Sequence, residues 1–379
     1  MLDDTPVCYK DNTISLTNIN HLSTMISFTR TKKWPNVRRF FLVGWLMVAL
    51  TSQVAAEVLR VLAWPGYADA DLVQGFEQRT GARVEVTTID TDEALWQKIN
   101  HNQGKDFDVF AINTADLQRC IANAIVQPVN LAAVPNTARQ LPRFRNVTAI
   151  AGLVHNGQVF GVPYTYAEMG LIYDRQQVSP APDSITALWD TRWRGRVLLY
   201  NSGSHNFSLA ALALGNASPF RISPQQWPAA VDKLIELRRN ALGFYSEPEE
   251  SAEQFKNKKA AIMLANYGSQ QVKLLKSAGV DVGYAIPKEG ALAWLDVWAI
   301  TRGSSKLALA HQWINYLLES APGEALTSRQ GLASTTSKPK YLSVTDRLIW
   351  LEPVEDIQRR STLWERIYSG DRARQVLAP

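Results

Sequence analysis

Segments typical of strands and segments typical of helices alternate from residue 58 to residue 124. The expected strands are the apolar or alternating runs Val58–Ala63, Ala82–Thr88 and Phe107–Ile112. The expected helices begin at Asp69 or Asp71, at Asp92 and at Asp116, and they end at Arg79, Asn100 and Ala124. This β-α-β-α-β-α order predicts an α/β fold with a parallel sheet and right-handed crossovers. Because ligands of such sheets bind at the carboxyl ends of the strands, we expect the loops Trp64–Tyr67 and Asn113-Thr114 to line a ligand site.

A second α/β unit follows, without detectable sequence repetition of the first. Its expected strands and helices are, in chain order, Val197–Tyr200, Asn206–Leu214, Trp227–Asn240, Ala260–Leu264, Ser269–Ser277 and Val280–Ile286. The chain passes between the two units near Pro163 and again within Pro287–Trp294, so the sequence predicts two lobes with a cleft between them. We expect residues 57–163 and about 297–325 in one lobe, and residues 164–296 and about 326–379 in the other.

Residues 1–56 follow the order of a secretory signal peptide. Arg30–Arg39 is basic, Phe40–Leu50 is an unbroken apolar run, and Thr51–Ala56 ends in small residues before Glu57. The apolar run is short for a membrane span, which needs about 20 residues, and an uncleaved anchor is the alternative. No lipobox-type cysteine follows the run. We therefore expect a protein that is free in the periplasm after cleavage.

Charge and cysteine content argue against two kinds of chemistry. The chain carries 40 Lys and Arg against 35 Asp and Glu, but six of the basic and three of the acidic residues lie in residues 1–56, so a charge of about +2 remains. No basic run suited to nucleic acid follows. Of the two cysteines, Cys8 lies in the signal-peptide region, which leaves Cys120 without an intramolecular disulfide partner. Cys120 is expected to be an inert core thiol.

The stretch that says most about function is Pro287–Ile300. After a turn, its run from Trp294 onward is apolar except for Asp296. On a strand, Trp294, Asp296 and Trp298 share one face, and Leu295, Val297 and Ala299 share the other. An unpaired buried charge is costly, whereas a carboxylate between indoles suits an ammonium group, because each aromatic contact adds about 0.5–2 kcal/mol of cation–π attraction. The alternative is that Asp296 pairs with a nearby Arg or Lys and that the tryptophans only pack.

Several stretches jointly resemble the periplasmic spermidine/putrescine-binding proteins of ABC importers. They are the signal peptide, Leu62–Phe76, Thr80–Val86, Phe107–Thr114, Gly161–Tyr164 and Pro287–Ile300. The resemblance covers nearly all of the chain after the signal-peptide region, in element order. It implies a two-lobed periplasmic-binding-protein fold with crossover hinge strands, of the type II kind, which hands its ligand to a membrane permease driven by a separate ATPase. The chain itself has no GxxxxGK[ST] motif.

The resemblance also implies a set of ligand-binding residues. Trp64 and Tyr67 match aromatics that stack on the polyamine in that family. Trp294 and Asp296 match its aromatic and its amine-binding carboxylate, and Tyr267 stands near the place of a family tryptophan. Further candidates come from the loops and crossing segments that face the expected cleft. The complete expected set is Trp64, Tyr67, Thr114, Tyr166, Ser202, His205, Tyr267, Trp294 and Asp296.

Two loops depart from the family pattern. Asn113–Asp116 lacks stacking aromatics, and Asn201–His205 has no carboxylate where the family holds a second amine. Ser202–Ser204 opens a helix, and a helix N-terminus suits an anion or hydroxyl, although an ordinary N-cap is the alternative. One hypothesis is therefore a ligand with one amine and a neutral or anionic other end, such as a 4-aminobutyrate-like, betaine-like or amino-sugar-like compound. Glu168 would restore a diamine site, unless it is a surface or capping carboxylate.

We expect a solute-binding component of an importer, with no catalytic residue, no cofactor and no metal. The histidines after residue 56 do not show metal-ligand spacing, and GxSxG is absent. The expected partners are a small amine and an inner-membrane ABC permease, and the protein is expected to be a monomer that does not bind nucleic acid. The alternatives are a periplasmic sensor that binds the same ligand and a periplasmic enzyme on the same fold.

Overall fold

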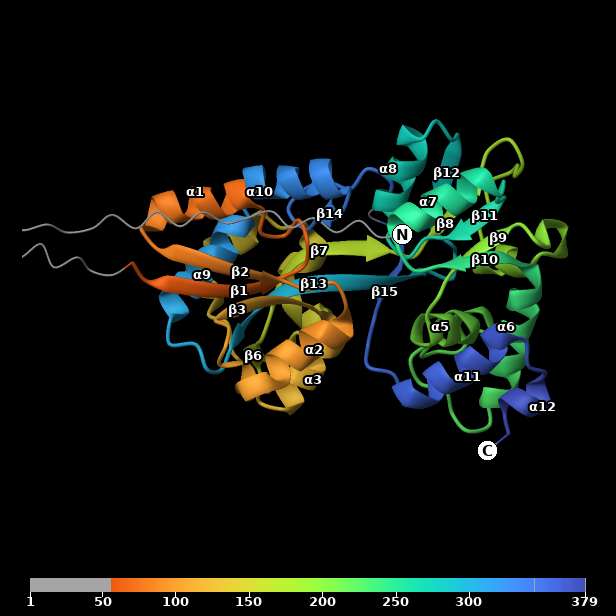
Figure 1. Ribbon diagram of the computed structural model, residues 1–379, viewed down its shortest axis with the longest axis horizontal. Coiled ribbons are helices and arrows are strands. Elements are labelled where there is room, and N and C mark those ends of the chain that lie inside the picture. The colour runs from red at the N-terminus through yellow and green to blue at the C-terminus, as the bar shows by residue number, and fades with distance from the viewer. Residues whose placement is uncertain (1–55, 344, 379) are drawn as a thin grey trace, which may run out of the picture. The chain divides into compact units, whose positions relative to one another are not determined.

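Two β-sheets, each covered by helices on both faces, make up the part of the chain that the computed structural model describes, residues 56–343 and 345–378 (Figure 1). The strands and helices predicted from residue 58 to residue 124 are all present. The predicted α/β class is confirmed, but each sheet also contains antiparallel pairs, whereas the sequence predicted a parallel sheet. The predicted signal peptide, apart from its last residue, lies outside the described residues.

The first sheet has the order β14-β7-β13-β3-β1-β2, and β15 and β4 also pair with β13. Its strands are β1 (Val58–Ala63), β2 (Arg83–Thr88), β3 (Val109–Asn113), β4 (Val126–Gln127), β7 (Val162–Glu168), β13 (Ala291–Thr301), β14 (Ala333–Ser334) and β15 (Leu348–Trp350). Strand β1 is parallel to both β2 and β3, as the sequence predicts. Strand β13 is antiparallel to β3 and β7, so a strand from much later in the chain sits between them.

Helices cover both faces of the first sheet because they are apolar on the side that faces it. On one face lie α1 (Ala70–Thr80), α9 (Leu307–Leu317) and α10 (Ser320–Ala325), and on the other lie α2 (Asp92–Asn100) and α3 (Thr114–Ala122). The C-terminal end of α1 follows the ordinary capping rule, since Gly81 ends the helix in a left-handed conformation with a φ of 71°. At its N-terminal end Asp69 is extended, but its side chain makes no capping hydrogen bond. The short helix α4 (Pro142–Arg145) lies between these elements in sequence.

The second sheet has the order β10-β9-β11-β8-β12. Its strands are β8 (Leu171–Asp174), β9 (Val197–Tyr200), β10 (Ala241–Tyr245), β11 (Ile262–Leu264) and β12 (Val282–Ala285). One face packs against α5 (Gly203–Ala213), α6 (Trp227–Asn240) and α11 (Ile357–Ser369), and the other against α7 (Pro248–Asn257) and α8 (Ser269–Ser277). Outside the sheets lie the short helix α12 (Ala373–Val376) and a hairpin of β5 (Val154–His155) and β6 (Gln158–Val159).

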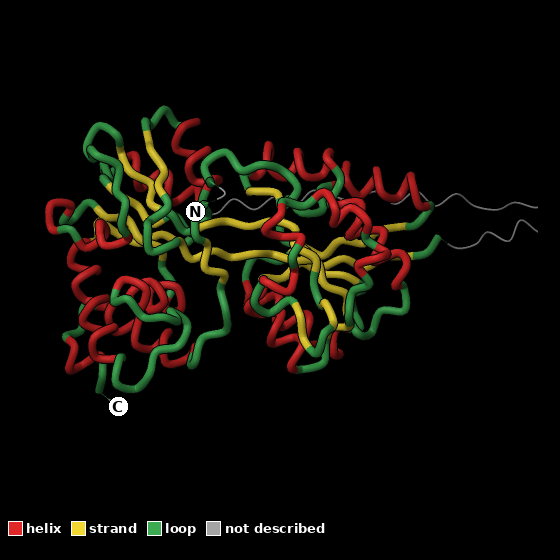
Figure 2. Tube along the Cα trace, turned by 180° about the vertical axis from the view of Figure 1, so that it is seen from behind, coloured by secondary structure: helices red, strands yellow, loops and turns green. Residues whose placement is uncertain are grey.

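The chain passes between the two sheets three times. It leaves the first sheet after β7, returns from β12 into β13, and leaves again after β15 to place α11 against α5 and α6. Figure 2 shows the long strands β7 and β13 running side by side. Both strands pair within the first sheet along their whole length. The lobe boundaries expected from the sequence remain a prediction.

Strand β13 has the two faces that its sequence predicts. Leu295, Val297 and Ala299 pack with the core under α2 and α3, and Trp298 packs with the core under α1 and α9. Opposite Asp296, the register of β7 shifts by a bulge. As a result Tyr164 packs with the Trp298 side of the sheet while Tyr166 packs with the other side. A strand without a bulge would place both tyrosines on one face.

Candidate functional site

Asp296 lies in the middle of β13 and is the residue around which the candidate site is built. Its side chain is only 7% exposed, and Tyr67 donates a 2.7 Å hydrogen bond from its hydroxyl to Asp296 Oδ2. No Lys or Arg of the described residues forms an ion pair with it. The alternative of a structural ion pair at Asp296 is therefore wrong within the described chain, since its charge is held by a phenol and not by a cation.

Two further carboxylates, Asp92 and Asp116, act electrostatically on Asp296, and Asn113 bonds to both of them. Asn113 is the residue directly across from Asp296 in the β3–β13 pair. Its side-chain amide donates to Asp116 Oδ2 at 2.8 Å and to Asp92 Oδ1 at 3.3 Å, and its carbonyl oxygen accepts from the Asp116 backbone N–H at 2.9 Å. Asp92 opens α2 and Asp116 lies in the first turn of α3, so both follow the carboxyl ends of strands.

The pKa values of all three carboxyl groups are raised above their usual range. Burial raises the pKa of Asp296 to about 7, the Tyr67 hydrogen bond opposes this, and the charges of Asp92 and Asp116 add to it. The Asp92 side chain still reaches solvent, but the surrounding protein removes enough water to raise its pKa to about 7, and the Asp116 charge adds to this. Burial also raises the pKa of Asp116. A site with this much uncompensated negative charge favours a cationic ligand.

Aromatic rings flank these carboxylates. Tyr67 is buried and meets Tyr164 edge to face, with 5.3 Å between ring centroids. Trp64 is half-buried in the loop after β1, and its indole N–H has no hydrogen-bond partner among the described residues. Trp294 is half-buried too, and its indole N–H donates to the carbonyl of Asn266 at 2.9 Å, which ties β13 to the loop after β11. We call Trp64, Tyr67, Asp92, Asn113, Asp116, Trp294 and Asp296 the Asp296 site.

A second group of predicted residues gathers around Tyr200, at the carboxyl end of β9. The His205 ring stacks on Tyr200 with centroids 5.5 Å apart, and Tyr267 meets Tyr200 edge to face at 6.0 Å. Tyr267 also donates its hydroxyl to the Ser246 carbonyl at 2.7 Å. The charge of Asp92 acts on Tyr200, although burial is the larger cause of the raised pKa of Tyr200. The Tyr200 cluster (Tyr200, His205, Tyr245 and Tyr267) is thus within electrostatic range of the Asp296 site.

Helix α5 begins at Gly203, three residues earlier than the sequence predicts, and Ser202 is its N-cap. The Ser202 hydroxyl accepts from the His205 backbone N–H at 3.4 Å, which is the ordinary capping role named as the alternative for this residue. Burial lowers the pKa of His205 to about 4, and the nearby Arg360 charge adds to the shift. His205 is therefore neutral at physiological pH and brings no positive charge to the site.

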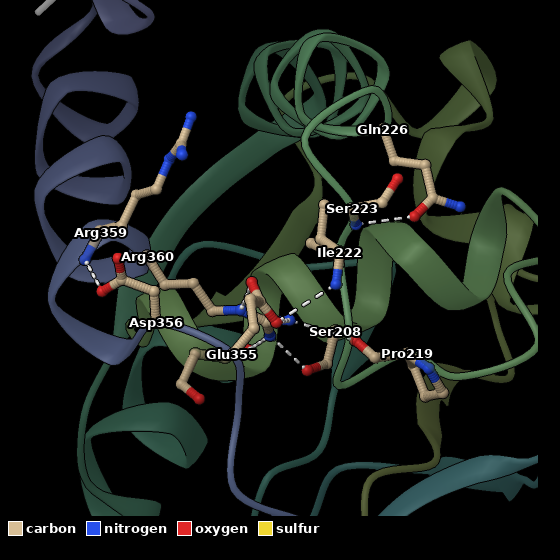
Figure 3. Close-up of polar contacts among 10 residues, drawn as sticks. Ser208, Pro219, Ile222, Ser223, Gln226, Glu355, Asp356, Arg359 and Arg360 are labelled. Atoms are coloured by element: carbon tan, nitrogen blue, oxygen red, sulfur yellow. Dashed lines mark hydrogen bonds and ion pairs between the residues drawn. The ribbon is translucent and has the colours of Figure 1, made fainter.

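Arg360 of α11 lies behind this loop and is fully buried (Figure 3). Its guanidinium group donates to both Glu355 carboxylate oxygens, at 3.0 and 2.8 Å, to Ser208 Oγ at 2.7 Å, and to the backbone carbonyls of Ser204 and Pro219 at 3.0 and 3.3 Å. From the same helix, Trp364 donates its indole N–H to Asn201 Oδ1 at 2.8 Å. Helix α11 thus supports the loop that leads from β9 into α5.

The structure does not bring three sequence candidates to the Asp296 carboxylate. Thr114 is fully buried, and its hydroxyl donates to the Leu351 carbonyl at 3.2 Å. Tyr166 is fully buried on the opposite face of the sheet, against Phe144 at 4.8 Å between ring centroids. Glu168 of β7 is 2% exposed and lies opposite Ala293 of β13, not opposite Asp296. Glu168 is therefore neither a surface residue nor a neighbour of Asp296.

The sequence interpretation missed Asp92, Asp116 and Tyr200 as site residues. Each lies at the carboxyl end of a strand or just after it. The rule that ligands bind at the carboxyl ends of strands, which selected Trp64 and Tyr67, could therefore have selected these residues too. Asp92 and Asp116 also look like ordinary acidic residues in the first turn of a helix. The sequence does not show that both residues bond to Asn113, or that β13 places Asp296 directly opposite Asn113.

Neither metal binding nor membrane insertion receives support from the described chain. Among residues 56–343 and 345–378, no three His, Cys, Asp or Glu side chains are arranged to hold a metal ion. In the same residues, no helix combines the length and the hydropathy that crossing a bilayer requires. Cys120 is fully buried in α3, and burial raises the pKa of its thiol to about 12, as fits an inert core residue.

The structure has a periplasmic-binding-protein fold. Two β-sheets covered by helices are joined by crossing segments, and polar and aromatic side chains lie at the strand ends. Residues 71–341 match the family described as bacterial extracellular solute-binding protein, and the chain belongs to that family. The predicted two-lobed fold and solute-binding role are thereby confirmed, and family members are binding components of transport systems and not enzymes.

Known relatives carry the same likeness across most of the chain. The putrescine-binding periplasmic protein PotF of Escherichia coli (strain K12) is 26% identical over 306 residues, which cover 76% of this chain and 80% of that protein. The solved spermidine/putrescine ABC transporter substrate-binding protein PotD of Streptococcus pneumoniae superposes with a TM-score of 0.68 at 20% identity and covers 85% of this chain and 99% of its own. A structure titled Atu4243-GABA receptor gives a TM-score of 0.64 at 18% identity, with 82% and 97% coverage. The predicted resemblance to spermidine/putrescine-binding proteins is confirmed.

Proposed function

We propose that this protein captures a small polyamine in the Asp296 site and delivers it, chemically unchanged, to an inner-membrane ABC permease. It acts as a monomer in the periplasm after removal of the signal peptide and does not bind nucleic acid. The observation that carries the proposal is a buried carboxylate, Asp296, that Tyr67 orients and that no cation of the described residues neutralises. The names of the polyamine-binding relatives agree with this choice of ligand.

A cation stabilises this arrangement more than a neutral ligand does. A buried carboxylate without a counter-charge has lost its hydration and gained little in return. An ammonium group supplies the missing charge and three N–H donors. The rings of Trp64, Tyr67 and Trp294 provide faces for the alkyl chain and for cation–π contact, worth about 0.5–2 kcal/mol.

Asp92 and Asp116 favour a ligand with more than one positive charge. They supply a second counter-charge from the first sheet, whereas the loop Asn201–His205 has none to offer. This changes the emphasis of the sequence hypothesis, which found no carboxylate for a second amine in the Asn201–His205 loop and named Glu168 as the residue that would restore a diamine site. A diamine can be neutralised by Asp296 together with the pair of carboxylates that Asn113 holds.

A zwitterion with one amine is the second candidate, and the Tyr200 cluster is the observation that favours it. Ser202 caps α5, so backbone N–H groups at that helix end suit a carboxylate. A neutral His205 offers hydrogen bonding without a charge. The Atu4243-GABA receptor shares the fold with this chain.

Titration calorimetry with putrescine, spermidine and 4-aminobutyrate tests the ligand class. We expect putrescine or spermidine to bind at least 100-fold more tightly than 4-aminobutyrate, because the zwitterion brings a second negative charge toward Asp92 and Asp116. Replacing both carboxylates (D92N/D116N) should bring the two affinities to within about tenfold of each other. Tight binding of 4-aminobutyrate with no response to putrescine would overturn the polyamine proposal in favour of the zwitterion.

Amine affinity is expected to rise with pH between about 5.5 and 7.5. In the free protein the pKa values of Asp296 and Asp92 are about 7, so both are largely protonated at pH 5.5. A bound ammonium group favours the ionised forms, so binding releases protons. For each proton released, the affinity should fall by up to about tenfold for each unit by which the pH is lowered. Calorimetry in two buffers of different ionisation enthalpy measures this release. His205 has a pKa of about 4 and stays neutral throughout this pH range, so it does not contribute to the proton release.

Direct tests of the permease step separate an importer component from a sensor. Uptake of labelled putrescine by cells that express the matching permease should require this protein, and recovery of unaltered ligand from the complex distinguishes binding from catalysis. A protein that binds putrescine but leaves uptake unchanged would fit the sensor alternative.

A further inference from the structure

A pocket that shares no residue with the Asp296 site opens where α8 meets the segments that follow α10. Its volume is about 290 Å³. Its walls come from α8, from the helical turn η7 (Leu326–Gln330), from β14 and from the loop over residues 337–341. No residue of the Asp296 site or of the Tyr200 cluster lines it. Space of this size accommodates a free amino acid or a molecule of similar bulk.

Glu168 is the acidic residue that lines this pocket, and it is buried. Its side chain is 2% exposed, and its Oε2 atom is buried without a hydrogen-bond partner among the described residues. The nearby Tyr284 hydroxyl donates to the Glu168 backbone carbonyl at 2.7 Å, and its proximity to the carboxyl group opposes the effect of burial on the pKa of Glu168. Burial raises the pKa of Glu168 to about 7. An unsatisfied buried carboxyl is costly, so a donor that enters the pocket would recover stability.

Lysines surround the same pocket near solvent. Lys273, Lys276, Lys338 and Lys340 all line it and are exposed. Lys276 and Lys340 lie over the Tyr341 ring, at 4.8 and 5.5 Å from its centroid. In the part of the chain that the structure describes, no carboxylate forms an ion pair with any of the four. The pocket therefore combines a negative group inside with positive groups at its rim.

We infer that this pocket is a second binding site for a zwitterion that carries a primary ammonium group at one end and a carboxylate at the other. The ammonium group meets Glu168 Oε2 inside, and the carboxylate meets Lys276, Lys338 and Lys340 at the rim. A simple anion would leave Glu168 unsatisfied, and a simple cation would meet the lysines on entry. The inference uses residues outside the Asp296 site, so it does not depend on the polyamine proposal.

The compound 6-aminohexanoate is a suitable probe, and hexanoate and hexylammonium are matched compounds with one charge each. Titration of D296N, in which the first site is weakened, should show one saturable site for 6-aminohexanoate. Adding Glu168→Gln should weaken it at least tenfold, as should adding K338Q/K340Q. Both single-charge compounds should bind at least tenfold more weakly. Lys288→Gln, which removes an exposed lysine paired with Asp183 outside the pocket, should change nothing.

Three outcomes would overturn the inference. The first is that the single variant D296N no longer binds 6-aminohexanoate. The second is that E168Q does not change the affinity for 6-aminohexanoate. The third is that hexanoate binds as tightly as 6-aminohexanoate. Putrescine affinity should stay within about twofold of the wild type in E168Q and in K338Q/K340Q. If putrescine fails to bind the wild type, the polyamine proposal fails, and the response of 6-aminohexanoate to E168Q still decides the second site.

Discussion

Asp296→Asn is expected to weaken putrescine binding by roughly 30- to 1,000-fold, which corresponds to about 2–4 kcal/mol. Asparagine keeps the shape of the side chain but removes the buried carboxylate that Tyr67 holds. The bound ammonium group would then lose its counter-charge in surroundings where water does not replace it. Calorimetry at pH 8, where Asp296 is ionised, measures the effect at full size.

The stability of D296N shows whether the loss comes from the ligand contact or from the fold. The folded pKa of Asp296, about 7, lies above its ordinary value of 3.8, so the folded protein holds more protons than the unfolded chain between these values. The wild type therefore loses stability as the pH rises from about 4 to about 7, and asparagine does not. Ligand-free D296N should melt at or above the wild-type temperature at pH 8. Wild-type putrescine affinity in D296N would remove Asp296 from the site.

Tyr67→Phe is the matched control for Asp296. It keeps the ring that meets Tyr164 and removes only the hydroxyl that holds Oδ2. We expect a smaller loss of putrescine affinity, about 0.5–1.5 kcal/mol or up to about tenfold, because the charge remains and only its orientation is relaxed. A loss in Y67F as large as in D296N would mean that orientation, and not charge, dominates.

Arg360→Met is expected to lower the free energy of unfolding by about 3–5 kcal/mol. The guanidinium group is fully buried and makes five hydrogen bonds to four residues, which Figure 3 shows converging between α11 and α5. Methionine fills similar space but leaves Ser208, the two carbonyls and the Glu355 carboxylate without this donor. Thermal unfolding should show a melting temperature lower by roughly 5–10 °C.

The neighbouring Arg359→Met provides the control for Arg360. Its side chain is exposed, extends away from the network in Figure 3, and lies 4.6 Å from the centroid of the Trp227 ring. Losing that contact should cost less than about 1 kcal/mol. Equal melting temperatures for R359M and R360M would show that the buried network contributes no more than a surface contact.

These two predictions concern different links between structure and function. Asp296 is expected to act on the ligand and to make the ligand-free protein less stable above pH 7, a cost that is common at binding sites. Arg360 acts on the fold, through the loop that carries Ser204 and the cap of α5. D296N should therefore change affinity without lowering stability, and R360M should lower stability first.

Local features of the chain determine most of its elements. The alternation of apolar strands with capped helices predicts β1, α1, β2, α2 and β3 in the right order, because side-chain periodicity and capping act between residues that are close in sequence. The two faces of β13 follow from its alternation for the same reason. The rule that ligands gather at the carboxyl ends of strands selects Trp64 and Tyr67, which the structure places near Asp296 or in the loop that carries its partner Tyr67.

Only the tertiary structure decides which carboxylates meet. Asp296 lies opposite Asn113 because β13 inserts antiparallel beside β3, and strand pairing over nearly two hundred residues of sequence is not encoded by local periodicity. The bulge in β7 sends Tyr166 to the other face of the sheet, and the position of Glu168 in that strand places it in the lysine-lined pocket. The sequence alone thus determines that a carboxylate sits between two tryptophans on one strand face. The long-range packing of the folded chain decides that no cation of the described residues pairs with this carboxylate. The same packing brings Asp92 and Asp116 within electrostatic range of it.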